Sequence, residues 1–188
     1  MIRLVIFDLD ETLLRLPVDW EGVKKDVIAY GNEEKLEFDE NAHILPLSAA
    51  VSSTPDRKKE VDSIWRRHET ETIEKKGVER YPEAEEFVKT LRAKGFLLAI
   101  ASNNNHATID LALEKAGMRN AFALIIGRDD VQNPKPAPDM LLKLAWKFKL
   151  EKSEIVFIGD GEGDRIAGAA AGIRTVLVKP GSVQYASF

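Results

Sequence analysis

Short apolar runs along the chain end abruptly in polar residues or glycine, which is typical of strands buried in a parallel sheet. Each run is shorter than the usual helix of a globular protein, so we expect each to form one strand. The runs cover residues 4–7, 96–101, 121–126, 155–158 and 175–178.

Apolar residues recur at helical spacing between the later runs, over residues 84–91, 109–116 and 140–148. The stretch 166–171 is crowded with Ala and Gly, as expected of a helix packed closely on a sheet. Glycines that can end a helix follow three of these segments, at Gly95, Gly117 and Gly172. Strands that alternate with helices predict an α/β fold with a parallel, doubly wound sheet.

Residues 15 to 80 interrupt this alternation. They lack a clear strand ladder and show helical spacing at Trp20, Val23 and Val27, and again from Val61 to His68. We therefore expect a mostly helical insertion after the first strand. Its middle, from residue 31 to residue 55, mixes acidic and apolar residues in no assignable pattern.

Composition narrows the class of protein. The chain has 188 residues, 44% hydrophobic and 31% charged, which suits one folded catalytic core with an insertion. A net charge of -4 argues against a nucleic-acid partner. Without cysteine no disulfide or thiolate metal site can form, and no apolar run could span a membrane. No signal-peptide pattern is present either, so we expect a cytoplasmic protein without a membrane partner.

Two carboxylates follow the first predicted strand. Asp8 and Asp10 are two residues apart, and side chains at this spacing in an extended chain project to the same side. Aspartate also occurs often in turns and helix caps, so this pair alone fits a turn as well as it fits a site.

A second acidic cluster, Gly159-Asp160-Gly161-Glu162-Gly163-Asp164, follows the run 155–158. The glycines fail the spacing of a dinucleotide-binding loop, and the acids would repel a pyrophosphate. An EF-hand fails too, because Arg165 and Ala171 would occupy its sixth and twelfth loop positions. Ligands collect at the carboxyl ends of parallel strands, and hard oxygen donors there suit Mg²⁺.

Two further segments supply what a phosphate needs. Ser102 and Asn103 lie between a predicted strand and a helix, where a hydroxyl and backbone N–H groups can face an anion. Lys135 lies among three prolines that stiffen its backbone, which suits a fixed cation. Taken singly, Ser102 fits an ordinary helix cap and Lys135 fits a surface lysine.

In order along the chain, FDLDETL, ASNN, KPAP and GDGEGD resemble the four motifs of the haloacid dehalogenase superfamily, in its phosphoglycolate phosphatase and β-phosphoglucomutase-like branch. The resemblance implies a Rossmann-like core over residues 1–14 and 82–188, with sheet order 5-4-1-2-3. Residues 15–81 match only in position the helical cap of this branch.

The resemblance also implies a role for each motif residue. Asp8 is the nucleophile that becomes an aspartyl-phosphate, and Asp10 is the acid and then the base. Mg²⁺ is expected at Asp8, the backbone carbonyl of Asp10, and Asp160, with support from Asp164.

The remaining motif residues are expected to contact the phosphate. Ser102 and the backbone of Asn103 hold its oxygens, while Lys135 offsets charge on the phosphoryl group and on Asp8. Thr12 hydrogen-bonds within its loop or to phosphate, and helix capping is an equal interpretation.

Two departures accompany the match. Gly161 stands where the fourth motif often has Ser or Thr, and Gly163 where Asn is common, so a side-chain hydrogen bond near the metal is expected to be missing. Asp10 argues against the dehalogenases of the superfamily, which lack a carboxylate there. The first motif also differs from that of P-type ATPases.

The expected insertion would roof the site, with hinges near residues 15–17 and 80–82. Five of its side chains are candidates for substrate contact, although each taken singly fits an ordinary surface or hydrogen-bonded side chain better. They are Arg15, His43, Arg66, Arg67 and His68.

These features predict a Mg²⁺-dependent phosphatase that acts on a small phosphorylated metabolite, such as phosphoglycolate or a sugar phosphate. A phosphomutase of the β-phosphoglucomutase type would use the same motifs. A non-catalytic regulator that keeps the fold is a third alternative. Monomer and homodimer both stay open.

Overall fold

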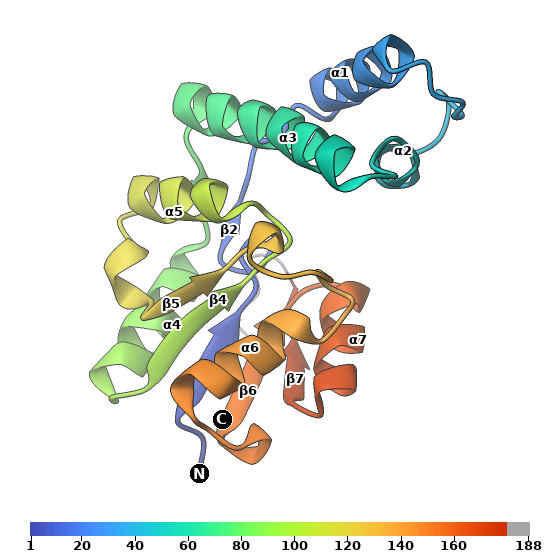
Figure 1. Ribbon diagram of the computed structural model, residues 1–188. Coiled ribbons are helices and arrows are strands. Elements are labelled where there is room, and N and C mark those ends of the chain that lie inside the picture. Colours follow the sequence, from blue (N-terminus) through green and yellow to red (C-terminus); the bar gives the residue numbers. More distant parts are fainter. Residues whose placement is uncertain (180–188) are drawn as a thin grey trace. The chain divides into compact units, whose positions relative to one another are not determined.

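The five apolar runs form one parallel sheet in the computed structural model, which describes residues 1–179 (Figure 1). The sheet order is β5-β4-β1-β6-β7, so counting these five strands alone it runs 5-4-1-2-3 from the β7 edge. The strands are β1 (Leu4–Phe7), β4 (Leu97–Ala101), β5 (Leu124–Ile126), β6 (Ile155–Gly159) and β7 (Arg174–Leu177). The predicted α/β class is therefore confirmed.

The central strand β1 pairs with β4 on one side and with β6 on the other. The register places Phe7 level with both Ile100 and Ile158, so the three strands end at the same edge. The chain leaves β1 toward β4 and later returns to β6 on the opposite side. This reversal is the topological switch point at which open α/β sheets bind ligands.

Helices cover both faces of the sheet (Figure 1). Leu4 and Ile6 of β1 belong to a buried cluster with α6 and α7, whereas Phe7 points the other way. Phe7 meets Phe87 of α4 and also Phe122 edge-on, with ring centroids 6.2 Å apart in each pair. The core helices are α4 (Pro82–Ala93), α5 (His106–Lys115), α6 (Asp139–Phe148) and α7 (Glu162–Ala171).

The Ala- and Gly-rich stretch packs closely on the sheet, as its composition predicts. A Cβ atom at Gly168 of α7 would overlap the side chain of Thr175 in β7. Gly172 then ends α7 with a left-handed backbone, φ 68°. Glycine at these two positions lets α7 lie against β7 and lets the chain turn into that strand.

Several short elements that the sequence did not predict accompany the five-stranded sheet. Strands β2 (Leu14–Arg15) and β3 (Glu79–Arg80) form an antiparallel pair, and three 3₁₀ turns lie in the loops. The turns are η1 (Arg119–Ala121), η2 (Arg128–Asp130) and η3 (Lys152–Glu154).

The chain divides into two compact units, one made of Met1–Leu16 and Val78–Phe188, the other of Pro17–Gly77. The pairing of β2 with β3 ties residues 14–15 and 79–80 to the first unit.

The insertion unit is a three-helix assembly of α1 (Trp20–Glu33), α2 (Ile44–Val51) and α3 (Pro55–Lys76). Val23, Val27 and Trp65 are buried in its own hydrophobic cluster, as the helical spacing predicts. Trp20 is instead half exposed, with its ring edge-on to Trp65 at 5.6 Å. Helix α2 lies in the stretch that had no assignment.

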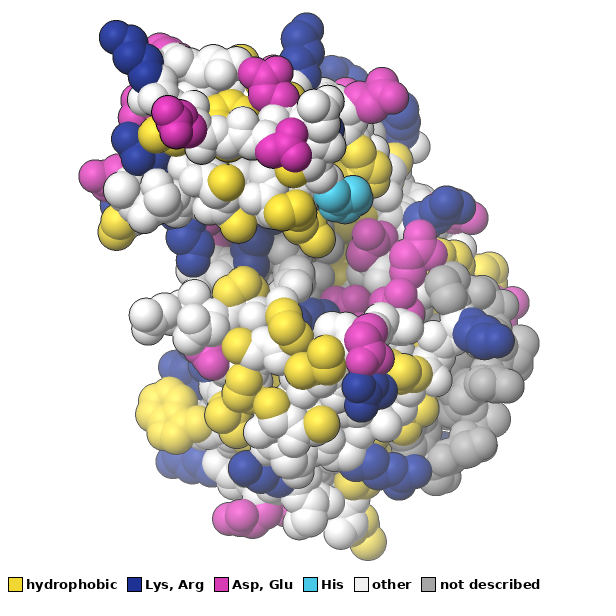
Figure 2. Space-filling model, turned by 90° about the vertical axis from the view of Figure 1, so that its right-hand side faces the viewer, with side chains coloured by type: hydrophobic (Ala, Val, Ile, Leu, Met, Phe, Trp, Pro, Cys, Tyr) yellow, Lys and Arg dark blue, Asp and Glu magenta, His cyan; other side chains and the backbone are white. Residues whose placement is uncertain are grey.

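On the surface drawn in Figure 2, basic and acidic side chains are interspersed, with hydrophobic side chains between them. Among residues 1–179, no helix combines the length and the apolar character needed to cross a membrane.

Candidate active site

The four motifs meet at the edge of the sheet where β1, β4 and β6 end. Asp8 directly follows β1, Ser102 follows β4 and Asp160 follows β6. The Asp8 N–H continues the ladder by donating to the Ile158 carbonyl at 2.8 Å. Lys135 reaches the same edge from the loop that precedes α6.

Lys135 lies between two carboxylates. Its Nζ donates to Asp8 Oδ1 at 2.7 Å and to Asp164 Oδ1 at 2.6 Å, and all three side chains are nearly buried. Burial alone would lower the pKa of Lys135, but the two carboxylates outweigh it and raise that pKa above its usual value. Lys135 is therefore a permanent cation in contact with Asp8, and not the surface lysine of the alternative interpretation.

Three carboxylates could hold a metal ion. Asp8, Asp160 and Asp164 each offer an oxygen, and these oxygens lie within 4.8 Å of one another. Thr12 Oγ1 donates to Asp160 Oδ1 at 3.3 Å, and the Gly161 N–H donates to Asp164 Oδ2 at 3.1 Å. A set of hard oxygen donors from two segments of the chain fits Mg²⁺.

The side chain of Asp10 lies outside this group of potential ligands. Its Oδ1 accepts a hydrogen bond from the Leu16 N–H at 2.8 Å, which fixes the orientation of the carboxyl group. Burial raises the pKa of Asp10 to about 6, and repulsion from Asp8, Glu11 and Asp160 adds to the effect, against the Leu16 hydrogen bond. A carboxyl group with this pKa can both release and accept a proton near neutral pH.

The electrostatics of the site call for a cation. Asp8 and Asp164 share the ammonium group of Lys135, while Asp10 and Asp160 lie close enough to Asp8 to repel it. Burial raises the pKa of Asp8, with Lys135 opposing, and burial also raises the pKa of Asp160, to about 6. A divalent cation would relieve this repulsion, so the residues present fit Mg²⁺.

The expected phosphate ligands make contacts of their own. Ser102 Oγ is buried and accepts hydrogen bonds from the Asn104 N–H at 3.3 Å and from its side-chain Nδ2 at 3.2 Å. Asn103 Nδ2 donates to the Lys135 carbonyl at 2.8 Å, so this side chain joins the loop after β4 to the lysine loop. The Thr12 hydroxyl donates to Asp160. Phosphate binding by Thr12, Ser102 and Asn103 stays a prediction.

A glycine of the fourth motif leaves room for the Asp164 carboxylate. A Cβ atom at Gly159 would overlap the Asp164 side chain. Gly161 offers no side-chain hydrogen bond, but its backbone N–H donates to Asp164. Gly159 thus allows Asp164 to lie against the backbone.

One polar contact beside the site, between Tyr81 and Glu11, could not be predicted from the sequence. The Tyr81 hydroxyl donates to Glu11 Oε2 at 2.7 Å, across 70 positions of the chain. Burial and this hydrogen bond raise the pKa of Tyr81, so its hydroxyl keeps the proton that it donates. The only local signal was Glu11 itself, which follows Asp10 in a tight turn.

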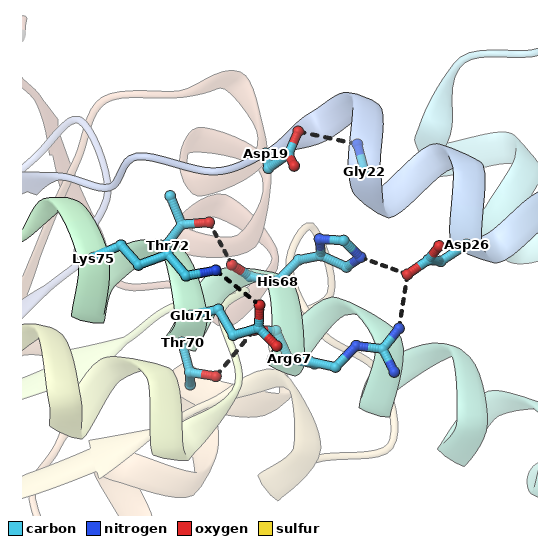
Figure 3. A network of polar contacts seen from close by, with 9 residues as sticks. All are labelled: Asp19, Gly22, Asp26, Arg67, His68, Thr70, Glu71, Thr72 and Lys75. Atoms are coloured by element: carbon cyan, nitrogen blue, oxygen red, sulfur yellow. Dashed lines mark hydrogen bonds and ion pairs between the residues drawn. The ribbon is translucent and has the colours of Figure 1, made fainter.

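Two of the insertion's candidate residues are engaged within the insertion unit. Arg67 and His68 of α3 both point to Asp26 of α1, at 2.7 and 2.8 Å (Figure 3). Arg66 is exposed on α3, and His43 is exposed at the position before α2. Arg15, which belongs to the core unit, forms ion pairs with Glu11 and Glu79.

Comparison with known proteins gives matches over most of the chain. The model of a family described as haloacid dehalogenase-like hydrolase matches residues 5–178. Pyrophosphatase PpaX of Halalkalibacterium halodurans is 35% identical over 124 residues, 66% of this chain and 57% of the relative. Phosphoglycolate phosphatase of Shigella boydii serotype 4 is 28% identical over 204 residues, 93% of this chain and 80% of the relative.

A solved structure agrees in fold. The crystal structure of a predicted phosphoglycolate phosphatase from Haemophilus somnus covers 94% of this chain and 84% of its own, with a TM-score of 0.67 and 24% identity.

Proposed function

Because this chain belongs to the haloacid dehalogenase-like hydrolase family, we propose that it is a Mg²⁺-dependent phosphatase that hydrolyses a small phosphomonoester through an aspartyl-phosphate at Asp8. One observation carries the proposal. A buried lysine joins Asp8 to Asp164, at the point where Asp160 arrives from the neighbouring strand. This arrangement combines a fixed nucleophile with groups that neutralise charge.

In the first step an Asp8 carboxylate oxygen attacks phosphorus, while the bond from phosphorus to the ester oxygen breaks. Asp10 gives its proton to that oxygen, so the leaving group departs as an alcohol. Lys135 holds one oxygen of Asp8 and keeps the carboxylate aligned. Its positive charge also favours the approach of an anionic substrate.

In the second step Asp10, now ionised, takes a proton from a water molecule. The water oxygen attacks phosphorus, the bond to Asp8 breaks, and inorganic phosphate leaves with Asp8 restored. The pKa of about 6 suits Asp10 to both directions of transfer. Ser102 and the backbone at Asn103 would hold the phosphate oxygens.

Asp8, the carbonyl of Asp10, and Asp160 would hold the metal, with Asp164 in support. When bound, Mg²⁺ supplies positive charge that lowers the repulsion between the carboxylate nucleophile and the phosphate.

The named relatives guide the choice of substrate. They are called phosphoglycolate phosphatase and pyrophosphatase PpaX, and the chain spans 57% of the length of the latter. We therefore favour hydrolysis over the mutase alternative, with phosphoglycolate or a sugar phosphate as substrate. The helical insertion would select the leaving group. A cytoplasmic location and the choice between monomer and homodimer stay predictions.

The proposal can be tested with purified protein on a panel of phosphoglycolate, sugar phosphates, nucleotides, pyrophosphate and an aryl phosphate. We expect phosphate release with Mg²⁺, none with chelator, and at least a 1,000-fold loss, roughly the effect of removing a nucleophile, in Asp8→Asn. Acid quenching during turnover should trap ³²P on the wild-type protein and not on Asp8→Asn. Turnover that survives both chelation and Asp8→Asn would contradict the mechanism.

A further inference from the structure

Glu11, the residue after Asp10, has an unusual backbone. Its φ is 58°, in the left-handed region that glycine adopts easily and other residues rarely do. The turn is closed by hydrogen bonds from the Glu11 N–H to the Leu14 carbonyl at 2.8 Å and from the Leu14 N–H to the Leu9 carbonyl at 3.1 Å. Such a conformation persists where surrounding contacts hold it.

The Glu11 carboxylate has those contacts on both oxygens. Oε2 accepts the Tyr81 hydroxyl at 2.7 Å, and Oε1 pairs with Arg15 Nε at 3.2 Å. Arg15 also lies 3.8 Å from Glu79. Arg15 is in β2, Glu79 is in β3 and Tyr81 directly follows β3. The Glu11 carboxylate therefore joins both strands of the antiparallel β2–β3 pair, which we call the β2–β3 ribbon.

This ribbon carries the chain into and out of the insertion unit, because β2 precedes Pro17 and β3 follows Gly77. The same ribbon holds Asp10. The Leu16 N–H that fixes Asp10 Oδ1 comes from the residue after Arg15. Any shift of β2 therefore changes the contacts of Asp10 and of Glu11 together.

We propose that Glu11 and Tyr81 are positioning residues, which clamp the β2–β3 ribbon so that Asp10 is aimed at the oxygen of the leaving group. The clamp acts through Asp10 and does not touch substrate. This inference rests on the proposed phosphatase function, in which Asp10 donates the proton.

The clamp predicts a dependence on the leaving group. For monoesters, kcat/KM reports the transfer of the phosphoryl group to Asp8. A weakly basic phenolate leaves without protonation, whereas a strongly basic alkoxide needs the proton of Asp10. A misaligned Asp10 therefore slows alkyl esters much more than activated aryl esters, while a general structural defect slows both alike.

The test measures kcat/KM for a series of aryl and alkyl phosphates of increasing leaving-group basicity. In Tyr81→Phe and Glu11→Gly we expect about a tenfold loss for the alkyl esters, a part of the 10²–10⁴-fold effect of a general acid, and less than a twofold loss for the best aryl ester. Glu11→Gln keeps an oxygen that accepts the Tyr81 hydroxyl but loses the ion pair with Arg15, so its loss for the alkyl esters should be smaller than that of Glu11→Gly.

The test controls for misfolding and for the loss of a tyrosine hydroxyl elsewhere in the chain. Glycine adopts the turn at position 11 without strain, so Glu11→Gly should fold, and its thermal midpoint checks this. Tyr30→Phe makes the same chemical change in α1 of the insertion unit and should leave the series unchanged. Parallel losses across all esters in Tyr81→Phe and Glu11→Gly, or no loss, would overturn the clamp. A wild-type protein inactive on every ester would instead overturn the phosphatase function.

Discussion

At the scale of single residues, Lys135 is the most constrained side chain of the site. Its ammonium group lies between Asp8 and Asp164, and its side chain is only 5% exposed. Removing one partner from a buried ion pair leaves uncompensated charge, which destabilises a protein far more than loss of a surface pair does.

We therefore predict that Lys135→Met lowers the free energy of unfolding by about 3 kcal/mol in chelator at pH 8. Urea unfolding measures the change. Lys147→Met removes an exposed lysine of α6 that lies over the Trp146 ring and should cost less than about 0.5 kcal/mol. Equal losses in the two variants would contradict the prediction.

The residues of the site differ in how far the sequence could locate them. Asp8, Ser102 and Asp160 could be placed together because each follows an apolar run, and parallel strands of equal register end at one edge. The pairing of Tyr81 with Glu11 could not, because the two residues are 70 positions apart, on either side of the insertion. The bond from Asn103 to the Lys135 carbonyl also depends on loop conformation, which no local pattern encodes.

At the scale of elements, the approach of α7 to β7 depends on Gly168. We predict that Gly168→Ala destabilises the protein by about 1–3 kcal/mol, because the added Cβ would overlap Thr175. Thr175→Ala in the same chain should recover part of the loss, as a double-mutant cycle in urea would measure.

Gly163→Ala is the matched control for that prediction, since it adds a Cβ to the same helix where nothing lies within 4 Å. Alanine has the higher helix propensity, so stability should stay equal or rise by up to about 1 kcal/mol. If Gly168→Ala behaved like Gly163→Ala, the close approach of α7 to β7 would be wrong.

Long elements were predictable and short ones were not. The helices α4 to α7 bury a periodic face, and all four are followed at once, or within two residues, by glycine or a left-handed residue. Strands β2 and β3 have two residues each, too few to show alternation. Helix α2 has Pro46 in its first turn, where proline is tolerated but disguises a helix in sequence.

The insertion unit has a hydrophobic cluster of its own, in which Trp65 is 6% exposed and donates to Ser48 Oγ at 3.1 Å. We predict that Trp65→Ala costs the insertion about 3–5 kcal/mol and lowers hydrogen-exchange protection within residues 17–77. Protection of the β-sheet should change little, and Trp146→Ala, an exposed site on α6, should change neither unit. Equal loss of protection in the sheet would show that the two units unfold together.

At the scale of the whole molecule, the buried carboxylates link stability to pH and to the metal. The pKa values of Asp10 and Asp160 are about 6 in the folded protein, against a usual 3.8. A group whose pKa is raised by folding holds its proton more tightly in the folded state. Its contribution to stability is full below about pH 4 and is lost as pH rises through 6.

In chelator, the free energy of unfolding should therefore fall between pH 4 and pH 7, as measured by urea unfolding at fixed ionic strength. Asp26, Glu85, Glu154 and Glu162 have lowered pKa values and act in the opposite sense below about pH 4.5, so they affect only the lower end of this window. Mg²⁺ favours the ionised carboxylates, so saturating Mg²⁺ should remove most of the decline.

The double variant Asp10→Asn, Asp160→Asn separates these carboxylates from every other titrating group, because it removes both protons and keeps the shape of the side chains. In chelator its decline between pH 4 and pH 7 should be smaller than that of the wild type, and the part that is left is assigned to Asp8, whose pKa burial also raises. A decline of the same size in the variant would assign the pH dependence to other groups. A flat wild-type profile would mean that the site does not hold its protons as the burial of these carboxylates requires.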